Sequence, residues 1–408
     1  MTHRRVVVTG CGAVSPLGLS ADAHWEGLVH GRSGIDFIRS FDARDFPVKV
    51  AGEVKDFTVP ASLPRTLAMA FTAAEEAAAQ AGLHSLRPDA RCGVYCGGTM
   101  EWPDLDDELV PLHRGDETKP RAPSLLTQRR MRLGGMATLV ARRIGIASRM
   151  RGAQVIDGAC ASGGMAIGEA FHRIRAGVLD VAVSLGACSW TNLVGLSLYY
   201  KLAALSSEAS AAASRPFDAK RSGFVMAEGA GAVILEPLEQ AQARGAIPLA
   251  EVTGYGVTGS AFRITDMPDE GIPQHRAMDV ALRDARRSGA DVDYINAHGT
   301  ATQQNDVVET QAIRRLLGAR ARDVPISSNK SMTGHSITAA GALEAIATIY
   351  TIREGIIPPT INLHNPDPQC DLDYVPNTSR RRETRVALSN AFGFGGHNCA
   401  LVLEAYTG

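Results

Sequence analysis

Cys160 is the residue of this sequence best placed to act as a nucleophile. It follows an apolar predicted strand, Ala153–Ile156, and the short turn Asp157-Gly158-Ala159, and it precedes small residues and a predicted helix. This order is typical of a nucleophile elbow, in which small neighbours let the backbone bend and a substrate approach. A thiol at the start of a helix faces unpaired N–H groups that favour the thiolate. Free cysteines are more often buried core residues, but the turn and its small neighbours favour a nucleophile.

Two histidines could act together with this thiol. His298 directly follows the predicted strand Ile295–Ala297, and His335 lies just before a predicted helix. Either one alone could be a hydrogen-bonded structural histidine, but two in the same half of the chain predict a pair facing the cysteine. Lys330 has small and apolar neighbours, and Glu344 lies about two and a half helical turns beyond His335. We therefore expect a buried Lys330–Glu344 ion pair, with a surface lysine as the alternative.

A glycine-rich stretch, Asn390 to Asn398, contains Phe392, Phe394 and Gly395. Glycines there would let a backbone N–H approach a carbonyl oxygen on which negative charge develops. An ordinary hairpin turn between two predicted strands is equally compatible with the spacing. The stretch lacks the strand-then-helix context of a dinucleotide fingerprint, so it does not predict phosphate binding.

The elements that must position these residues follow an α/β pattern of buried strands alternating with alanine-rich helices. The predicted strands are Arg5–Thr9, Gly93–Cys96, Ala153–Ile156, Val181–Leu185, Ala232–Glu236, Ile295–Ala297, Val386–Leu388 and Cys399–Glu404. The predicted helices are Leu67–Ala81, Gly163–Ala176, Gly271–Ala285, Asp306–Leu317 and Ala339–Ile352.

Internal repeats indicate that this α/β unit is duplicated. The segment Val8–Gly12 recurs as Val252–Gly256, and Cys160–Ala170 aligns with His335–Ala345. We therefore predict two similar layered halves, residues 1–250 and 251–408, related by a pseudo-twofold axis, with Cys160 and His335 at equivalent helix starts. Residues 100–131 are polar and break the pattern, which predicts a functional excursion or a partner-facing loop.

Composition excludes several classes of function. The 408 residues include 42 basic and 43 acidic side chains, a balance that argues against nucleic-acid binding. The seven cysteines are scattered without disulfide or metal-ligand spacing, so we expect a cytoplasmic protein without a metal site. No apolar run approaches the roughly 20 residues of a membrane-spanning helix, and no redox-cofactor motif is present.

Taken in order, Cys160, His298-Gly299-Thr300, Lys330 to His335 and Gly393 to Gly396 resemble the β-ketoacyl-acyl-carrier-protein synthases of the elongating type. The resemblance covers nearly the whole chain, from Val8 to the last predicted strand. It implies the thiolase fold, an acyltransferase activity and usually a dimer.

The resemblance also implies roles for the residues singled out above. Cys160 would accept an acyl group, and His298 and His335 would donate hydrogen bonds to the carbonyl of a malonyl thioester as it loses carbon dioxide. Lys330, paired with Glu344, would orient His335. The resemblance places the oxyanion and gate positions at Phe394, Phe392 and Gly395, with the N–H groups of Cys160 and Phe394 as the donors, pantetheine binding at Thr300 and Thr302, and a supporting residue at Asp306. The partner would be an acyl carrier protein, whose phosphopantetheine brings the acyl and malonyl thioesters, so that no resident cofactor is expected.

Departures from the family pattern bear on the pathway. The second glycine of the His-Gly-Thr-Gly-Thr motif is Ala301, and His397 follows Gly-Phe-Gly-Gly where a threonine is usual. Together with the unusual 100–131 segment, these favour a specialised polyketide or polyene synthase over a housekeeping fatty acid synthase. The dimer would contain two copies of this chain or one copy with a chain-length-factor-like subunit.

Four rival functions are disfavoured by the same residues. A non-catalytic partner subunit commonly replaces the active cysteine with glutamine, and a priming enzyme has asparagine where this chain has His335. A thiolase needs a second reactive cysteine near the C-terminus, in a Cys-Gly-Gly-like context that is not found here. A cysteine hydrolase would need a His–acid dyad, and neither histidine has an acid at that spacing.

Overall fold

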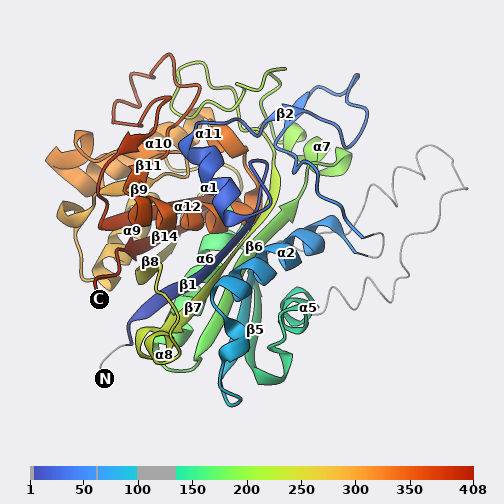
Figure 1. Cartoon of the computed structure of the whole chain (residues 1–408). Helices are drawn as coiled ribbons and strands as arrows, with labels where there is room; N and C mark the ends of the chain where they lie inside the picture. Colours follow the sequence, from blue (N-terminus) through green and yellow to red (C-terminus); the bar gives the residue numbers. More distant parts are fainter. Residues whose placement is uncertain (1–3, 61–62, 99–134) are drawn as a thin grey trace, which may run out of the picture.

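A ten-stranded sheet runs through the computed structural model, which describes residues 4–60, 63–98 and 135–408 (Figure 1). One half of the sheet comes from the first part of the chain, in the spatial order β1 (Val6–Val14), β7 (Glu228–Pro237), β6 (Val181–Ser189), β4 (Cys92–Gly97) and β5 (Met150–Ile156). The other half runs the opposite way, in the order β8 (Ala250–Gly259), β14 (His397–Glu404), β13 (Val386–Gly393), β9 (Tyr294–Asn296) and β10 (Ile326–Ser327).

The two halves have the same pairing pattern. Each half of the described sheet has five strands in this order. The first two neighbouring pairs are antiparallel, and the last two neighbouring pairs are parallel. The halves join where Val6–Val8 of β1 pairs antiparallel with Ala250–Val252 of β8. This correspondence confirms the duplicated α/β architecture predicted from the repeats.

The repeated glycines explain why the same short sequence occurs in both halves. Helix α2 (Arg65–Gln80) covers β1, and helix α9 (Ile272–Asp284) covers β8. A Cβ added to Gly12 would lie 2.0 Å from the carbonyl oxygen of Ala73, and one added to Gly256 would lie 2.1 Å from that of Ala277. Each strand therefore needs glycine where its covering helix makes backbone contact.

Two buried helices carry the equivalent helix starts into the centre of the molecule. Helix α6 (Ser162–Arg175) and helix α12 (Ala340–Glu354) pack against each other and against strands of the sheet (Figure 1). Their close approach requires glycine at position 163. A Cβ there would lie only 2.8 Å from the amide nitrogen of Ala342. This packing brings the segments before the two helices, which contain Cys160 and His335, to one place.

Most predicted elements are confirmed with shifts of a few residues at their ends. The other α-helices in the described residues are α1 (Ala21–Val29), α5 (Gly135–Arg143), α7 (Leu193–Lys201), α8 (Leu238–Ala243), α10 (Gln303–Leu317) and α11 (Lys330–Thr333). Among the described residues, two small two-stranded antiparallel sheets are formed by β2 (Asp36–Phe37) with β3 (Val50–Ala51) and by β11 (Ile356–Ile357) with β12 (Arg380–Arg381). The predicted excursion at residues 100–131 lies outside the described residues.

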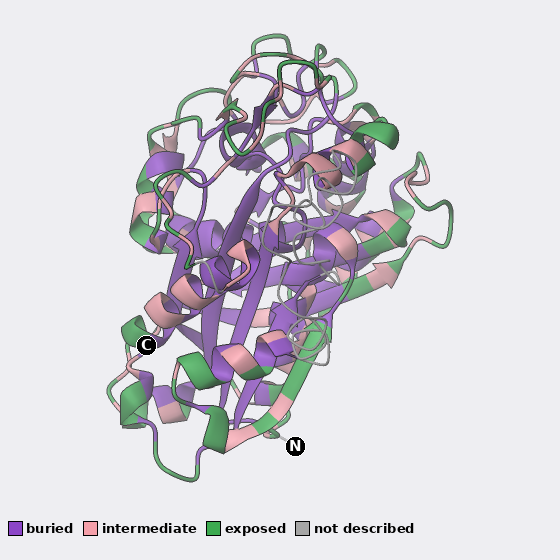
Figure 2. Cartoon of the chain, turned by 90° about the vertical axis from the view of Figure 1, so that its right-hand side faces the viewer, coloured by how far each residue is buried: buried purple, intermediate pink, exposed green. Residues whose placement is uncertain are grey.

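Strand β5 differs from the rest of the sheet in its burial. The central strands are buried, whereas six of the seven residues of β5, all but Ile156, are exposed or half-buried (Figure 2). β5 is the edge strand and pairs only with β4 among the described residues. No strand from the described part of the chain therefore pairs with its outer edge, which makes this edge open to pairing.

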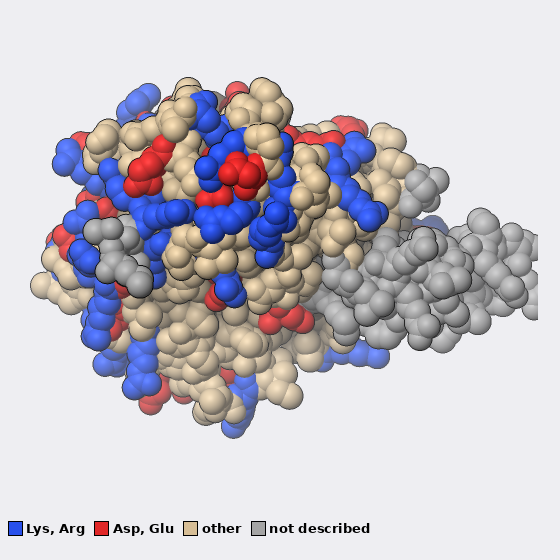
Figure 3. All heavy atoms as spheres, turned by 90° about the horizontal axis from the view of Figure 1, so that it is seen from below, with Lys and Arg blue, Asp and Glu red and all other residues tan. Residues whose placement is uncertain are grey.

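The surface charges are mixed in sign. On the face seen from below, Lys and Arg side chains lie among Asp and Glu side chains (Figure 3). Arg44, for example, pairs with Asp42 at 2.6 Å, and Arg283 pairs with Asp279 at 2.8 Å. No helix in the described part of the chain is long and apolar enough to span a membrane.

Candidate active site

Cys160 lies on a strained turn between β5 and α6. The residue before it, Ala159, has a φ of 51°, a left-handed conformation that non-glycine residues rarely adopt. Ser162 fixes this turn, because its hydroxyl accepts from the Gly158 N–H at 2.9 Å and donates to the Ala159 carbonyl at 2.7 Å. The geometry is that of the predicted nucleophile elbow, with the thiol in a 3-10 turn over Ala159–Ala161.

Burial dominates the electrostatics of the thiol. It raises the pKa of Cys160 to about 11, against the opposing effects of the Lys330 charge and of the backbone N–H groups of Phe394 and Cys160. The backbone N–H groups favour the thiolate, as expected from the helix start, but desolvation of the buried sulfur has the larger effect. The resting thiol is protonated at neutral pH, and its proton must be removed before it attacks a carbonyl.

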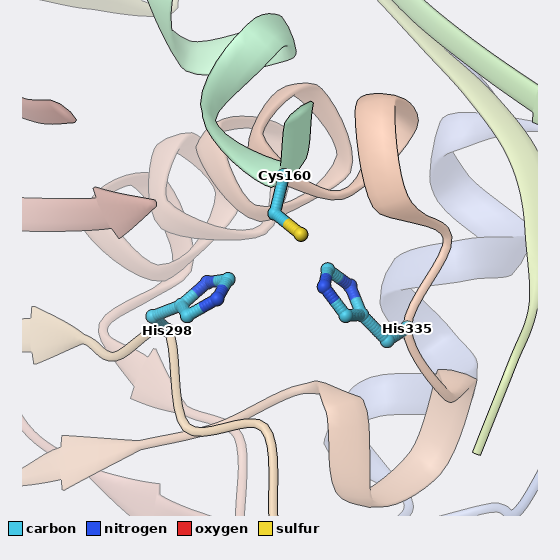
Figure 4. A group of neighbouring side chains, drawn as sticks. All are labelled: Cys160, His298 and His335. Carbon is cyan, nitrogen blue, oxygen red and sulfur yellow. The ribbon is translucent and has the colours of Figure 1, made fainter. Parts of the chain in front are cut away.

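His298 and His335 converge on this sulfur (Figure 4). The sulfur and one ring nitrogen from each histidine all lie within 4.8 Å of one another, a spacing at which they could also hold a metal ion. The ring centroids are 5.3 Å apart and the rings are nearly perpendicular, at 83°. Burial and the nearby Lys330 charge hold the pKa of both imidazoles well below the usual value, so both rings are neutral.

Lys330 forms the predicted buried ion pair with Glu344, but the histidine that it contacts is His298 and not His335. Its ammonium group donates to the backbone carbonyl of His298 at 2.7 Å and lies 3.3 Å from His298 Nδ1. The ring nitrogens of His335 have no hydrogen-bond partner among the described residues. The expectation that Lys330 orients His335 is therefore wrong, because α11 directs this side chain toward the loop that follows β9.

His335 is positioned by its backbone and by a neighbouring ring instead. Its N–H donates to the Val225 carbonyl at 2.7 Å, and its carbonyl accepts from the Ala227 N–H at 3.0 Å. The Phe224 ring packs edge-on against the imidazole, with 5.1 Å between ring centroids. The preceding Gly334 has a φ of 74°, the counterpart of the strained Ala159 in the other half.

Glu309 is a site residue that the sequence reasoning missed. This fully buried carboxylate accepts from the backbone N–H of His298 at 2.9 Å and of Gly299 at 2.8 Å. The Asn390 side chain donates to it at 3.1 Å. Its position one helical turn after Asp306 on α10 was the available signal, since both acids fall at helical spacing on the face that continues with Ile313 and Leu317, and acids on an apolar face indicate that it supports something polar.

Asp306 supports the next part of the same loop. It is buried and accepts from the Ala301 N–H at 3.2 Å and from the Phe217 N–H at 2.8 Å. The guanidinium of buried Arg221 lies 3.7 Å away and provides the balancing charge. This geometry agrees with the supporting role expected for Asp306.

A pocket of about 250 Å³ leads to the three reactive side chains. Thr300 and Thr302 line it, with their hydroxyl oxygens 2.9 Å apart, and amide side chains continue the polar wall. Other residues lining the pocket include Gln303, Gln304, Asn305, Phe392 and Phe394. The pocket therefore presents hydroxyl and amide groups along a wall that leads to the sulfur.

The glycine-rich stretch is both a hairpin turn and part of the site. Phe394 begins the turn between β13 and β14, and its backbone N–H faces the Cys160 sulfur. The Gly395 N–H donates to the Ile264 carbonyl at 2.7 Å, which leaves the Phe394 N–H as the group of this turn that faces the sulfur. Phe392 lies within β13 and packs edge-on against His298, with centroids 5.8 Å apart. The Phe394 ring stacks on Tyr199 at 6.3 Å, which holds it beside the pocket.

Comparison with known proteins accounts for nearly the whole chain. The family model described as "Beta-ketoacyl synthase, N-terminal domain" matches residues 3–241, and "Beta-ketoacyl synthase, C-terminal domain" matches residues 249–364. The chain is 42% identical to 3-oxoacyl-[acyl-carrier-protein] synthase 2 of Synechocystis sp., over 100% of this chain and 99% of the relative. It is 39% identical to "Putative polyketide beta-ketoacyl synthase 1" of Streptomyces halstedii, over 98% of each chain. The solved structure of "The ishigamide ketosynthase/chain length factor" matches with a TM-score of 0.89 and 36% identity, over 99% of this chain and 100% of that one.

Proposed function

The chain belongs to the β-ketoacyl synthase family, and we propose that it extends an acyl chain by two carbons through decarboxylative condensation with malonyl-acyl carrier protein. Its fold is the thiolase fold that the resemblance implied, and its activity class is that of a condensing acyltransferase. The observation that carries the proposal is the convergence of one thiol and two neutral imidazoles within 4.8 Å at the end of a pocket.

In the first half-reaction, Cys160 takes the acyl group. Because burial keeps the thiol protonated, a base must accept its proton, and the unpaired, neutral ring of His335 is available for this. The sulfur attacks the thioester carbonyl, and the resulting oxyanion accepts from the N–H groups of Cys160 and Phe394. Loss of one such donor typically costs about 100- to 1,000-fold in rate. The carrier thiol leaves with the proton.

In the second half-reaction, the two histidines stabilise an enolate. The ammonium of Lys330 faces His298 Nδ1, so this ring carries its proton on Nε2 and presents a fixed donor to the pocket. His335 supplies a second N–H to the malonyl thioester carbonyl. Cleavage of the carboxylate bond releases carbon dioxide and places its electron pair on the enolate. The enolate carbon attacks the acyl-Cys160 carbonyl, the C–S bond breaks, and the thiolate takes up a proton from solvent water.

The carrier arm is the substrate group that fits the pocket. Its amides could hydrogen-bond to Thr300 and Thr302, and its thioester would reach the sulfur. We propose an acyl carrier protein as the partner and no resident cofactor, since the name of the Synechocystis relative includes the acyl carrier protein on which that enzyme acts. A cysteine hydrolase is disfavoured because Lys330, and not a carboxylate, faces Nδ1 of His298.

We propose further that the enzyme serves a specialised polyketide or polyene pathway and assembles with a second subunit. The similarity to a ketosynthase/chain length factor structure supports a heterodimer, and the open edge of β5 supports assembly at that strand. A homodimeric housekeeping fatty acid synthase is the alternative. Mass measurement of the native complex after co-expression with neighbouring genes distinguishes a heterodimer from a homodimer, and elongation rates on saturated acyl carriers distinguish the pathways.

The test of the chemistry is the Cys160→Gln variant. We expect condensation to stop, because no acyl group can be loaded, while decarboxylation of malonyl-acyl carrier protein persists at the two histidines. Decarboxylation is followed as acetyl-carrier formation by mass spectrometry. Persistence of decarboxylation in a Cys160→Gln, His335→Ala double variant at the rate of the single variant would contradict the proposed role of the histidine pair.

A further inference from the structure

We propose that Cys160, His298 and His335 bind one zinc ion per chain, and that zinc bound there prevents acylation. One thiol and two imidazoles are ligands that zinc prefers, and three protein ligands with an open fourth position form a common zinc coordination. All three side chains are buried, and each comes from a separate segment of the chain held by the packing of the two halves. The proposal depends on this geometry and not on the condensation reaction.

The ligand atoms need only a small movement to meet zinc. Tetrahedral zinc with Zn–S of about 2.3 Å and Zn–N of about 2.0–2.1 Å places its ligand atoms about 3.3–3.6 Å apart. The three atoms now lie within 4.8 Å of one another, so the side chains must close by about 1 Å. The pocket of about 250 Å³ beside them leaves room for a fourth ligand such as water or chloride.

The hydrogen bonds of the three side chains determine how each can meet the ion. The thiol releases one proton as the Zn–S bond forms. The two rings differ in availability, because both nitrogens of His335 are unpaired whereas Nδ1 of His298 faces Lys330.

Binding at His298 therefore requires a local rearrangement of protons. Lys330 keeps two other partners, the His298 carbonyl and Glu344, so its ammonium can leave Nδ1. The ring proton then moves to Nδ1 and frees Nε2 for zinc. We expect Cys160 and His335 to contribute most to affinity, with His298 completing the site.

Zinc bound in this way acts as an inhibitor. The Zn–S bond occupies the electron pair with which the sulfur attacks a thioester, and the ion holds the ring that would accept the thiol proton. Conversely, an acylated Cys160 has no thiolate to offer, so an acyl group and zinc exclude each other at this site.

The experiment measures zinc and cobalt binding to the purified chain. We expect one equivalent of zinc per chain after equilibration in a metal buffer, and a cobalt derivative with a thiolate-to-cobalt charge-transfer band and tetrahedral spectrum. Cys160→Ala and His335→Asn should each weaken zinc binding by more than about 100-fold, since outer-shell partners alone contribute 10- to 100-fold. His84→Asn, at an exposed position outside the site, is the matched control and should leave binding unchanged.

A second measurement uses the wild-type chain and so does not depend on variant folding. Zinc should protect Cys160 from iodoacetamide, followed by the mass of its peptide, and a chelator should restore alkylation. Equal zinc affinity in the wild type and Cys160→Ala, an octahedral cobalt spectrum without thiolate charge transfer, or unchanged alkylation in the presence of saturating zinc would each overturn the proposal.

Discussion

Replacing Glu309 with glutamine should slow the enolate-forming step while sparing acyl transfer. Each oxygen of the Glu309 carboxylate accepts from one backbone N–H of the turn that carries His298, at 2.9 and 2.8 Å. Burial raises the pKa of this carboxyl, and the N–H donors oppose that shift. Glutamine keeps the size of the side chain but places an NH₂ group opposite one of these N–H donors.

The magnitude follows from the bond that is lost. A hydrogen bond to a charged group contributes about 1.5–3 kcal/mol, and the unpaired N–H is left buried. If loss of this bond raises the activation free energy of decarboxylation by the same amount, because His298 is less well positioned, the decarboxylation rate falls by about 10- to 150-fold. The assay is decarboxylation of malonyl-acyl carrier protein, compared with acylation of Cys160 from an acyl carrier, each followed by mass spectrometry.

The comparison between the two half-reactions decides the outcome. We expect decarboxylation by Glu309→Gln to fall by the stated factor and acylation of Cys160 to change by less than about threefold. Glu239→Gln, at an exposed position in the first turn of α8, is the matched control. A decarboxylation rate within twofold of wild type, or an equal loss in both half-reactions, would refute the reasoning.

Three further predictions concern packing, the thiol and the buried ion pair. Gly12→Ala and Gly256→Ala should each lower the melting temperature by a similar amount, because overpacking costs about 1–3 kcal/mol and both added Cβ atoms meet a helix carbonyl near 2 Å. Alkylation of Cys160 by iodoacetamide should accelerate about tenfold per pH unit up to about pH 10, because burial raises its pKa to about 11. Lys330→Met should destabilise the fold by about 3–5 kcal/mol in chemical denaturation, because it leaves Glu344 buried without its cation, and adding Glu344→Gln should recover part of the loss.

Each of these predictions has its own control. Gly259→Ala is matched to the glycine pair, since nothing lies within 4 Å of its added Cβ, and an equal loss of stability there would contradict the packing argument. A plateau of the alkylation rate below pH 8 would show that the helix start outweighs desolvation at Cys160. No recovery in the Lys330→Met, Glu344→Gln double variant would show that the two side chains are not energetically coupled.

The elements predicted best from the sequence were those with a local signal. Buried strands such as β6 have β-branched runs, and helices such as α6 are rich in residues that favour helix. The sequence marks strand β8 only as a repeat of β1, because glycines weaken the pattern of a strand. The helix that packs on these glycines explains why they are needed. Helix α7 has no clear helical signal in the sequence, since LVGLSLYYK is mostly apolar and its few polar residues do not form one face. The division of the chain at residue 250 stays a prediction.

The reactive residues were predicted, but their mutual contacts were not. Cys160, His298 and His335 stand out because each interrupts small residues at an element boundary. Which imidazole Lys330 contacts depends on how α11 lies against the loop after β9, and no periodicity of the sequence specifies that. The direction of the pKa shift of Cys160 could not be predicted either, since the desolvation of its thiol depends on side chains from both halves.

The burial of all seven cysteines has a practical consequence for detecting this enzyme in mixtures. Six of them pack in the interior, while Cys160 also lines the pocket. An electrophile carried on a pantetheine-like arm should therefore tag the native protein at one position. The labelled fraction would measure the share of chains in which the Cys160 thiol is free to accept an acyl group.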